Sequence, residues 1–244
     1  MSMSIVITMA GLGSRFRNAG YGLPKYEIEV RGRTLFSWSL HSLVNFIRPE
    51  NRFIFICLLG SQARSFIASQ ARELGISDWT ILELGALTDG QATSALAAKP
   101  ALTSVEQPML VYNIDTYVEP HCLLPAYWTA DGWIPCFEGI GNAWSFIRLD
   151  EEGRVTEVRE KKRISPYASI GLYGFPSFAL YEETYRRCFA DPANLVKGER
   201  YIAPMYNFLI AQQQDVRMSL IPIQSVHPLG TPDDVQRFTL RSQP

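Results

Sequence analysis

The first 115 residues alternate short apolar strand patterns with helix patterns, and this alternation most limits the folds open to the chain. Four segments have the apolar, β-branched character of buried strands: Ser4–Met9, Phe53–Leu59, Trp79–Leu84 and Met109–Asn113. Helix patterns separate them at Leu35–Ile47, Ser61–Leu74 and Gln91–Ala98. Parallel strands need such crossovers. The alternation therefore predicts an α/β fold with a Rossmann-like, mostly parallel sheet covered by helices on both faces.

After Asp115 the pattern changes to that of antiparallel strands. Strand patterns occur at Gly132–Phe137, Ala143–Leu149, Arg154–Arg159, Ala168–Phe175 and Val216–Ile223. The second and third of these flank the turn sequence Asp150–Gly153, which predicts a hairpin. Further helices are predicted at Phe178–Phe189, Tyr201–Gln212 and Pro232–Leu240. Because no linker or repeat interrupts the chain, we expect one domain over residues 1–244, with halves of about 1–118 and about 119–244.

The composition excludes several classes of protein. Hydrophobic residues make up 47% of the chain, and 23 Lys and Arg balance 24 Asp and Glu, which is untypical of a disordered chain. A net charge of -1 provides no overall field for nucleic acid or an anionic membrane, so neither is an expected partner. The apolar N-terminal segment has no basic leader, and Phe53–Leu59 is too short to span a bilayer, so a cytoplasmic protein is expected. The four cysteines form no CxxC pattern and are expected to be buried, reduced thiols.

Three polar or glycine-rich features follow predicted strands directly. They are the loop that begins at Ala10, the loop that begins at Gly85, and Asp115. Ligands of open parallel sheets bind outside the carboxyl ends of the strands. The three features are therefore expected to meet at one ligand-binding edge of the sheet.

The loop after the first strand combines glycines with cations. Gly11 and Gly13 allow the backbone to approach a ligand closely, and Arg15 and Lys25 supply positive charge for phosphate. The loop is no dinucleotide fingerprint, because Phe16 occupies the position of the third glycine, and no Walker A lysine follows. An anion-binding loop is one interpretation, and a tight turn with two solvated cations is the other.

These residues belong to a longer series of motifs. They are Met9–Phe16 (MAGLGSRF), Gly20-Tyr21, Pro24-Lys25, Thr88–Ala92, Asn113–Asp115, Glu160-Lys161, Gly171–Phe175 and Gly230–Asp234. In this order the series resembles the sugar-phosphate nucleotidylyltransferases. More narrowly, it is similar to the small bacterial nucleoside-diphosphate-sugar pyrophosphorylases of capsule and surface-polysaccharide pathways. The resemblance covers most of the chain and implies a nucleotidyltransferase fold of the GT-A-like type, with a nucleotide half followed by an acceptor half.

The resemblance also implies an activity. Such an enzyme transfers a nucleoside monophosphate from a nucleoside triphosphate, here expected to be a pyrimidine one, to a sugar 1-phosphate or another small phosphorylated acceptor, and pyrophosphate leaves. Arg15 would hold the leaving phosphates and Lys25 the α-phosphate. The remaining nucleotide contacts implied are Ala10, Gly11, Gly13, Ser14, Thr88 and Gly90.

The cofactor that the resemblance implies is Mg²⁺, with Asp115 as a ligand, although an Asp after a strand can also cap a helix. Many family members carry a second Asp two residues before Gly-Thr-Pro, where this chain has Pro228. Asp233 or its neighbour Asp234 could substitute, but both also suit the first turn of a helix.

On the acceptor side the resemblance implies Glu160 and Lys161. Lys161 would bind the acceptor phosphate and Glu160 a hydroxyl or another polar group. The alternative is that the run from Glu160 to Arg163 is only a solvated charged face.

Two other functions remain open. A glycosyltransferase that uses a nucleotide-sugar usually carries an Asp-x-Asp metal motif, whereas this chain reads Asn113-Ile114-Asp115, and Arg15 and Lys25 would have no role. A non-catalytic nucleotide-binding protein is favoured by Pro228. The sequence does not determine the base, the acceptor or the oligomeric state.

Overall fold

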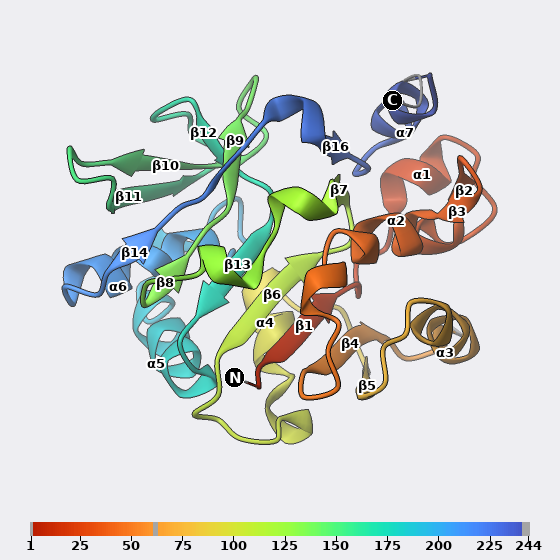
Figure 1. Ribbon diagram of the computed structural model, residues 1–244, viewed down its shortest axis with the longest axis horizontal. Helices are drawn as coiled ribbons and strands as arrows, with labels where there is room; N and C mark the ends of the chain where they lie inside the picture. Colours follow the sequence, from red (N-terminus) through yellow and green to blue (C-terminus); the bar gives the residue numbers. More distant parts are fainter. Residues whose placement is uncertain (1, 61–62, 241–244) are drawn as a thin grey trace.

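The parallel sheet predicted for the first half is confirmed. A computed structural model describes residues 2–60 and 63–240, and its largest sheet has seven strands in the order β14-β8-β13-β6-β1-β4-β5 (Figure 1). Strand β1 (Ser4–Thr8) lies between β4 (Arg52–Leu58) and β6 (Met109–Asn113), and β5 (Trp79–Leu84) follows β4. All of these pairs are parallel.

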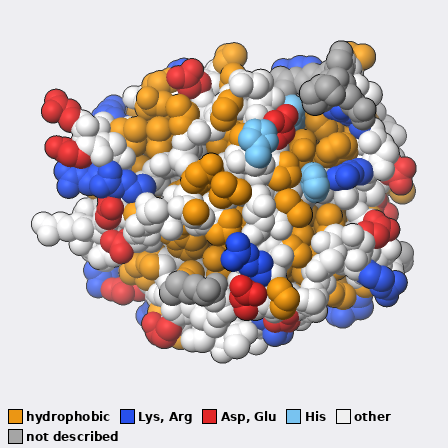
Figure 2. Space-filling model, viewed as in Figure 1, with side chains coloured by type: hydrophobic (Ala, Val, Ile, Leu, Met, Phe, Trp, Pro, Cys, Tyr) orange, Lys and Arg blue, Asp and Glu red, His pale blue; other side chains and the backbone are white. Residues whose placement is uncertain are grey.

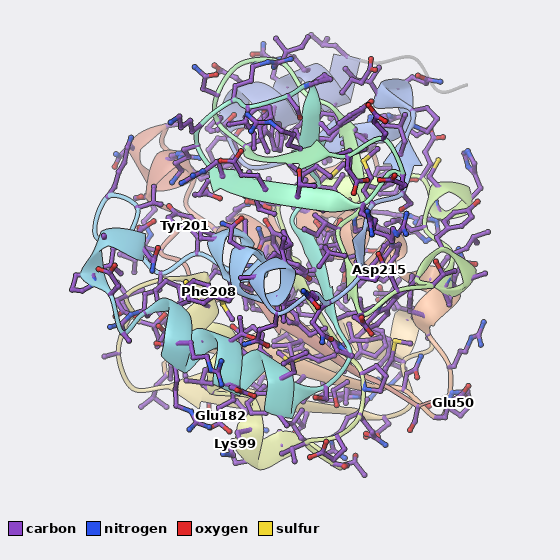
Figure 3. All side chains as sticks on the ribbon, turned by 90° about the vertical axis from the view of Figure 1, so that its left-hand side faces the viewer. Glu50, Lys99, Glu182, Tyr201, Phe208 and Asp215 are labelled. Atoms are coloured by element: carbon purple, nitrogen blue, oxygen red, sulfur yellow. The ribbon has the colours of Figure 1, made fainter. Side chains whose placement is uncertain are left out.

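Helices cover both faces of this sheet, because successive side chains of a strand point to opposite sides. Ile5 and Ile7 of β1 pack in a cluster with α2 (Leu35–His41) and α3 (Ala63–Glu73). The intervening residue of β1, Val6, packs on the other side with three helices, α4 (Gln91–Leu96), α5 (Phe178–Cys188) and α6 (Tyr206–Ala211). The labelled Glu182 of α5 and Lys99, in the turn after α4, form an ion pair of 2.8 Å (Figure 3).

The predicted helices exist, with shifted ends. The predicted start of α3 at Ser61 lies outside the described residues, and α2 ends at His41 instead of Ile47, followed by a short 3-10 turn. The segment predicted as a helix from Tyr201 becomes helical only at Tyr206, after a 3-10 turn at Ala203–Met205. Pro204 accounts for this, since proline is tolerated in a first turn but not in a helix interior.

The prediction of a single strand was wrong for three segments. Each of them forms two strands, which belong to different sheets. Gly132–Phe137 forms β8 (Gly132–Trp133) and β9 (Cys136–Glu138); Ala168–Phe175 forms β12 (Tyr167–Ser169) and β13 (Leu172–Phe175); Val216–Ile223 forms β14 (Val216–Arg217) and β15 (Leu220–Ile221). The breaks fall at Pro135, which cannot donate a ladder hydrogen bond, at Gly171, with φ +83°, and between Arg217 and Leu220.

The second sheet contains the predicted hairpin. Its five strands have the order β11-β10-β12-β9-β15. Strands β10 (Ser145–Leu149) and β11 (Val155–Glu160) pair antiparallel, with Ser145 opposite Glu160, which confirms the hairpin. In Figure 1 this sheet lies above the left part of the main sheet.

A third group of short elements closes the other side of the molecule. It comprises α1 (Ser14–Asn18), β2 (Glu29–Val30), β3 (Arg33–Thr34), β7 (Thr116–Val118), β16 (Val226–Pro228) and α7 (Pro232–Leu240). Strands β7 and β16 pair antiparallel, and Phe16, Leu229, Val235 and Phe238 form a small core. This pairing holds the C-terminal helix next to the loop that follows β1.

All four cysteines are buried, as expected, and none forms a disulfide. Within residues 2–60 and 63–240, no helix has the length and apolar character needed to cross a membrane. On the face shown in Figure 2, basic and acidic side chains are intermixed around a more hydrophobic middle.

The α6 helix offers a test of this packing. The Tyr206 hydroxyl is buried and donates a 2.7 Å hydrogen bond to the Gly174 carbonyl of β13. Tyr206→Phe should lower the free energy of unfolding by about 1–3 kcal/mol, because that buried carbonyl loses its donor. Urea denaturation would measure the loss. Tyr127→Phe, at an exposed tyrosine, is the matched control, and equal stability of the two variants would contradict this role.

Candidate active site

A cleft of about 1120 Å³ opens at the carboxyl ends of β1 and β6, between the main sheet and the second sheet. Most of the residues singled out in the sequence line this one cleft. They are Ala10, Gly11, Gly13, Ser14, Arg15, Lys25, Thr88, Gly90, Asp115, Glu160 and Lys161. Asp233 does not: it lines a separate surface pocket beside Ala19 and Tyr21.

The loop after β1 is shaped by Gly13 and Phe16. Gly13 has φ +60°, and a Cβ there would lie 3.3 Å from the Cβ of Lys25, so glycine suits both the backbone and the space. The N–H of Phe16 donates to the Gly13 carbonyl at 3.0 Å, and its buried ring anchors the first turn of α1. Lys25 starts a 3-10 turn after Pro24 and reaches the same cleft, with its Nζ 5.8 Å from the centre of the Phe16 ring.

Charges of both signs surround Lys25. Burial lowers the pKa of the Lys25 ammonium, Asp115 and Asp234 raise it, and Arg15 lowers it. The ammonium is therefore close enough to two carboxylates and to another cation for all three to act on it. Arg15, Lys25 and Asp115 line this part of the cleft, and Asp234 lies close enough to act on Lys25.

The carboxylates of Asp115 and Asp234 both lie beside Gly230. A Cβ on Gly230 would lie 3.7 Å from Asp115 Oδ2 and 3.9 Å from Asp234 Oδ2. Asp234 is held by Thr231, whose hydroxyl donates to Asp234 Oδ2 at 2.6 Å and accepts from the Asp234 N–H at 3.1 Å. The carboxylate that approaches Asp115 from α7 is thus Asp234, and Asp233 lies elsewhere.

This pair suits Mg²⁺, which takes one or two protein carboxylates together with substrate phosphates and water. Glycine at position 230 leaves the space between the two carboxylates without a side chain. Over the described part of the chain, no group of three or more His, Cys, Asp or Glu side chains could hold a metal, so a site here would depend on phosphate oxygens as well.

The loop after β5 is clamped to a distant segment. The Arg200 N–H donates to the Asp89 carbonyl at 2.7 Å, and the Arg200 side chain forms an ion pair with the Asp89 carboxylate. A Cβ on Gly90 would lie only 2.4 Å from the Arg200 carbonyl oxygen, so the two backbones touch there. Thr88 turns inward, and its hydroxyl contacts the Gly90 carbonyl at 3.0 Å and Ser94 Oγ at 2.6 Å.

The floor of the cleft contains polar side chains that the sequence did not single out as site residues. Gln91 donates to Asn113 Oδ1, and the Thr8 hydroxyl donates to the same oxygen at 3.3 Å. Their positions in the sequence could have indicated a site, because ligands bind at the carboxyl ends of parallel strands. Thr8 and Asn113 end two such strands, and Gln91 begins the helix after a third.

At the far end of the cleft, Glu160 and Lys161 separate from the rest of the charged run. Glu160 is buried against Ser145, whose hydroxyl donates to it, and burial raises the pKa of its carboxyl. Lys161 lines the cleft, whereas Lys162 and Arg163 are exposed outside it. Of the charged run, only Lys162 and Arg163 therefore belong to a solvated face.

Tyr201 and Glu199 also line this end and were missed. The Lys161 ammonium donates to the Tyr201 hydroxyl, which in turn donates to Glu199. The sequence carried no signal for Tyr201, because helical spacing placed it in a buried helix. Burial raises the pKa of the Tyr201 hydroxyl and Glu199 raises it further, whereas Arg15 opposes this rise, so Arg15 lies within electrostatic reach of Tyr201.

The fold and the sequence together match a solved protein. The nucleoside-diphosphate-sugar pyrophosphorylase from Vibrio cholerae RC9 is 36% identical, with a TM-score of 0.89, and the match covers 97% of this chain and 100% of that one. The chain belongs to the nucleoside-diphosphate-sugar pyrophosphorylase family. The resemblance of its motifs to sugar-phosphate nucleotidylyltransferases is thereby confirmed.

More distant structures share the fold of this pyrophosphorylase family member. An inositol-1-phosphate CTP transferase from T. maritima is 14% identical (TM-score 0.73, 95% of this chain and 90% of that one). A candidate glucose-1-phosphate thymidylyltransferase from Bacillus anthracis is 16% identical (TM-score 0.74, 97% and 94%). No protein-family model matches the chain, and no curated protein does.

Gly90 allows a test of the clamp. Gly90→Ala should distort the loop after β5, because the new Cβ would collide with backbone atoms of Arg200 that cannot rotate away. Gly75→Ala is the matched control, since Gly75 also has a positive φ but open space around it. Thermal unfolding should show a lower Tm for Gly90→Ala than for Gly75→Ala. A smaller loss at Gly90 would mean that the loop is free to move.

Proposed function

We propose that the chain transfers a nucleoside monophosphate from a nucleoside triphosphate to a sugar 1-phosphate or a similar small phosphorylated acceptor, with release of pyrophosphate. Membership of the pyrophosphorylase family supports this activity. The observation that carries it is that cations from two distant parts of the chain line one cleft: Arg15 and Lys25 follow β1, and Lys161 follows β11. A reaction between two phosphorylated substrates needs both to be neutralised in one place.

The chemistry follows from these charges. An oxygen of the acceptor phosphate attacks the α-phosphorus, the bond from that phosphorus to the bridging oxygen breaks, and pyrophosphate leaves with that bonding pair. The acceptor phosphate is already an anion, so no general base is needed. Catalysis of such a transfer is mainly positioning and stabilisation of charge. We assign the α-phosphate and the attacking oxygen to Lys25 and the leaving phosphates to Arg15.

The loop at Gly11–Ser14, with Ala10, is assigned to the triphosphate. Its glycines leave backbone N–H groups unshielded by side chains. The metal assigned to the site is Mg²⁺, held by Asp115 and Asp234, and when bound it neutralises part of the triphosphate charge. Asp234 is assigned in place of Asp233, because Asp234 lies with Asp115 beside Gly230 and Asp233 lines a separate pocket.

The base is assigned to Thr88 and Gly90, where the clamp to Arg200 limits the space. We infer a pyrimidine, an assignment supported by the CTP transferase and the candidate thymidylyltransferase that share the fold. Glu160 and Lys161 are assigned to the acceptor. We further propose that the enzyme works in the cytoplasm in capsule or surface-polysaccharide synthesis, as the resemblance to small bacterial family members implies.

Pyrophosphate release tests the activity. The purified protein with Mg²⁺ is incubated with CTP, UTP, dTTP, ATP or GTP, each with and without a panel of sugar 1-phosphates. Release that requires both substrates supports the proposal. Consumption of a nucleotide-sugar with release of a nucleoside diphosphate would instead identify a glycosyltransferase, and binding without turnover would identify a non-catalytic protein.

Lys25→Ala should reduce kcat by on the order of a hundredfold, because the developing charge at the α-phosphate loses its cation. Steady-state pyrophosphate release measures the effect. Lys99→Ala removes a lysine whose ion pair with Glu182 lies outside the cleft, and it should leave kcat unchanged. Turnover of the Lys25 variant near that of Lys99→Ala would remove Lys25 from the site.

Neighbouring aspartates on α7 provide a sharp test of the metal assignment. Asp115→Asn and Asp234→Asn should each raise the Mg²⁺ concentration for half-maximal activity by roughly ten- to a hundredfold. Asp233→Asn should have little effect, because Asp233 faces the separate pocket. Titration of Mg²⁺ at saturating substrates checks all three. If Asp233→Asn were the more damaging change on α7, the assignment would be reversed.

A further inference from the structure

The backbone presents Lys161 in an unusual way. Lys161 has φ +53°, in the left-handed region that non-glycine residues enter at a conformational cost. Its N–H donates to the Trp144 carbonyl at 2.9 Å, which ties it to the residue directly before β10. Residues are held in this region when the surrounding structure determines them strongly. Here the result is that Lys161 points into the cleft while Lys162 does not.

The side chain of Lys161 is restrained by Tyr201. The ammonium donates to the Tyr201 hydroxyl and lies 4.2 Å from the centre of its ring. It is also 3.9 Å from Glu160 Oε1. The side chain is 31% exposed, so the ammonium remains accessible from the cleft. Both an oxygen lone pair and an aromatic ring therefore favour this one position of the charge.

Tyr201 is itself fixed from both sides. Its hydroxyl donates to the Glu199 carboxylate. Next along the chain, Ile202 is fully buried, and before it Arg200 is bound through its backbone to Asp89 and Ala92 at 2.7 and 3.0 Å. Figure 3 shows Tyr201 in the connection that leads to α6. The ring that holds Lys161 thus belongs to a segment pinned to the loop after β5.

We propose that Tyr201 is a positioning residue for the acceptor phosphate: it holds the Lys161 ammonium in the cleft before the acceptor binds. The inference rests on the proposed function of the cleft. A lysine ammonium has three N–H donors, and the bond to Tyr201 uses one of them. The other two remain for phosphate oxygens. Because a free lysine side chain loses many rotamers on binding, prior restraint by Tyr201 strengthens acceptor binding.

Chemical labelling tests the restraint without any substrate. Wild-type protein and Tyr201→Phe are treated briefly with acetic anhydride, and mass spectrometry gives the ratio of acetylation at Lys161 to that at Lys162. The variant keeps the ring but loses the hydroxyl, so this ratio should rise severalfold. Tyr167→Phe, on β12 outside the cleft, should leave the ratio unchanged. An unchanged ratio in Tyr201→Phe would overturn the proposal.

Kinetics with glucose 1-phosphate as acceptor and CTP, UTP or dTTP as donor tests the consequence. Tyr201→Phe should raise the acceptor KM roughly two- to tenfold, because the net effect of losing one hydrogen bond is a change of this size. The donor KM and the Tm should stay unchanged. In a Lys161→Met background the same substitution should have no further effect, because Tyr201 acts through Lys161. Equal losses in both backgrounds would contradict this. If wild type shows no turnover of any pair, the proposed function fails for this acceptor, and the labelling ratio alone decides the role of Tyr201.

Discussion

Three neighbouring strands leave the main sheet along one line, and the position of the cleft depends on this bend. Strands β14, β8 and β13 lie side by side in the main sheet, and their continuations β15, β9 and β12 keep the same order in the second. Backbone hydrogen bonds persist across the line, from Ile134 to Arg217 at 3.0 Å, from Cys136 to Ser219 at 2.9 Å and from Ile170 to Pro135 at 3.2 Å. The three strands therefore bend as a unit, and the second sheet comes to lie beside the carboxyl ends of β1 and β6.

Two cations of the cleft, Lys25 and Lys161, lie near carboxylates. Lys25 is influenced by Asp115 and Asp234, and Lys161 lies near Glu160 and, through Tyr201, near Glu199. Such pairing limits the unfavourable energy of unpaired charges in a partly enclosed site. It also suits an enzyme whose two substrates are both polyanions, because phosphates and a metal ion can replace the internal partners when they bind.

The sequence predicted the parallel core and the chemistry of the loop after β1, since these depend on local patterns. Apolar runs separated by helices determine the parallel strands, and the glycines beside Arg15 indicate a binding loop. It did not predict the bend, because the apolar pattern of Ala168–Phe175 continues through Ile170 and Gly171 without showing that the strand changes sheets. Burial alone does not specify which neighbour a strand pairs with.

The sequence also did not predict which individual side chains reach the site. Asp233 and Asp234 both belong to the first turn of α7, and only the rotation of the helix about its axis determines which one faces Asp115. Tyr201 was assigned to a helix because Ile202, Met205 and Leu209 have helical spacing and are buried. The turn at Ala203–Met205 leaves Tyr201 outside the helix, where its side chain reaches the cleft. Both side chains owe their positions to contacts between segments far apart in the sequence.

The central claim is that one cleft binds a nucleoside triphosphate at Arg15 and Lys25 and leaves Lys161 for the phosphate of the acceptor. A crystal structure with Mg²⁺ and the α,β-methylene analogue of CTP would test it most directly. The account predicts the base at Thr88 and Gly90, an α-phosphate oxygen within hydrogen-bond distance of Lys25 Nζ, and the ion in contact with Asp115 and Asp234. A triphosphate bound outside this cleft, or one bound with its base against Lys161, would contradict the account.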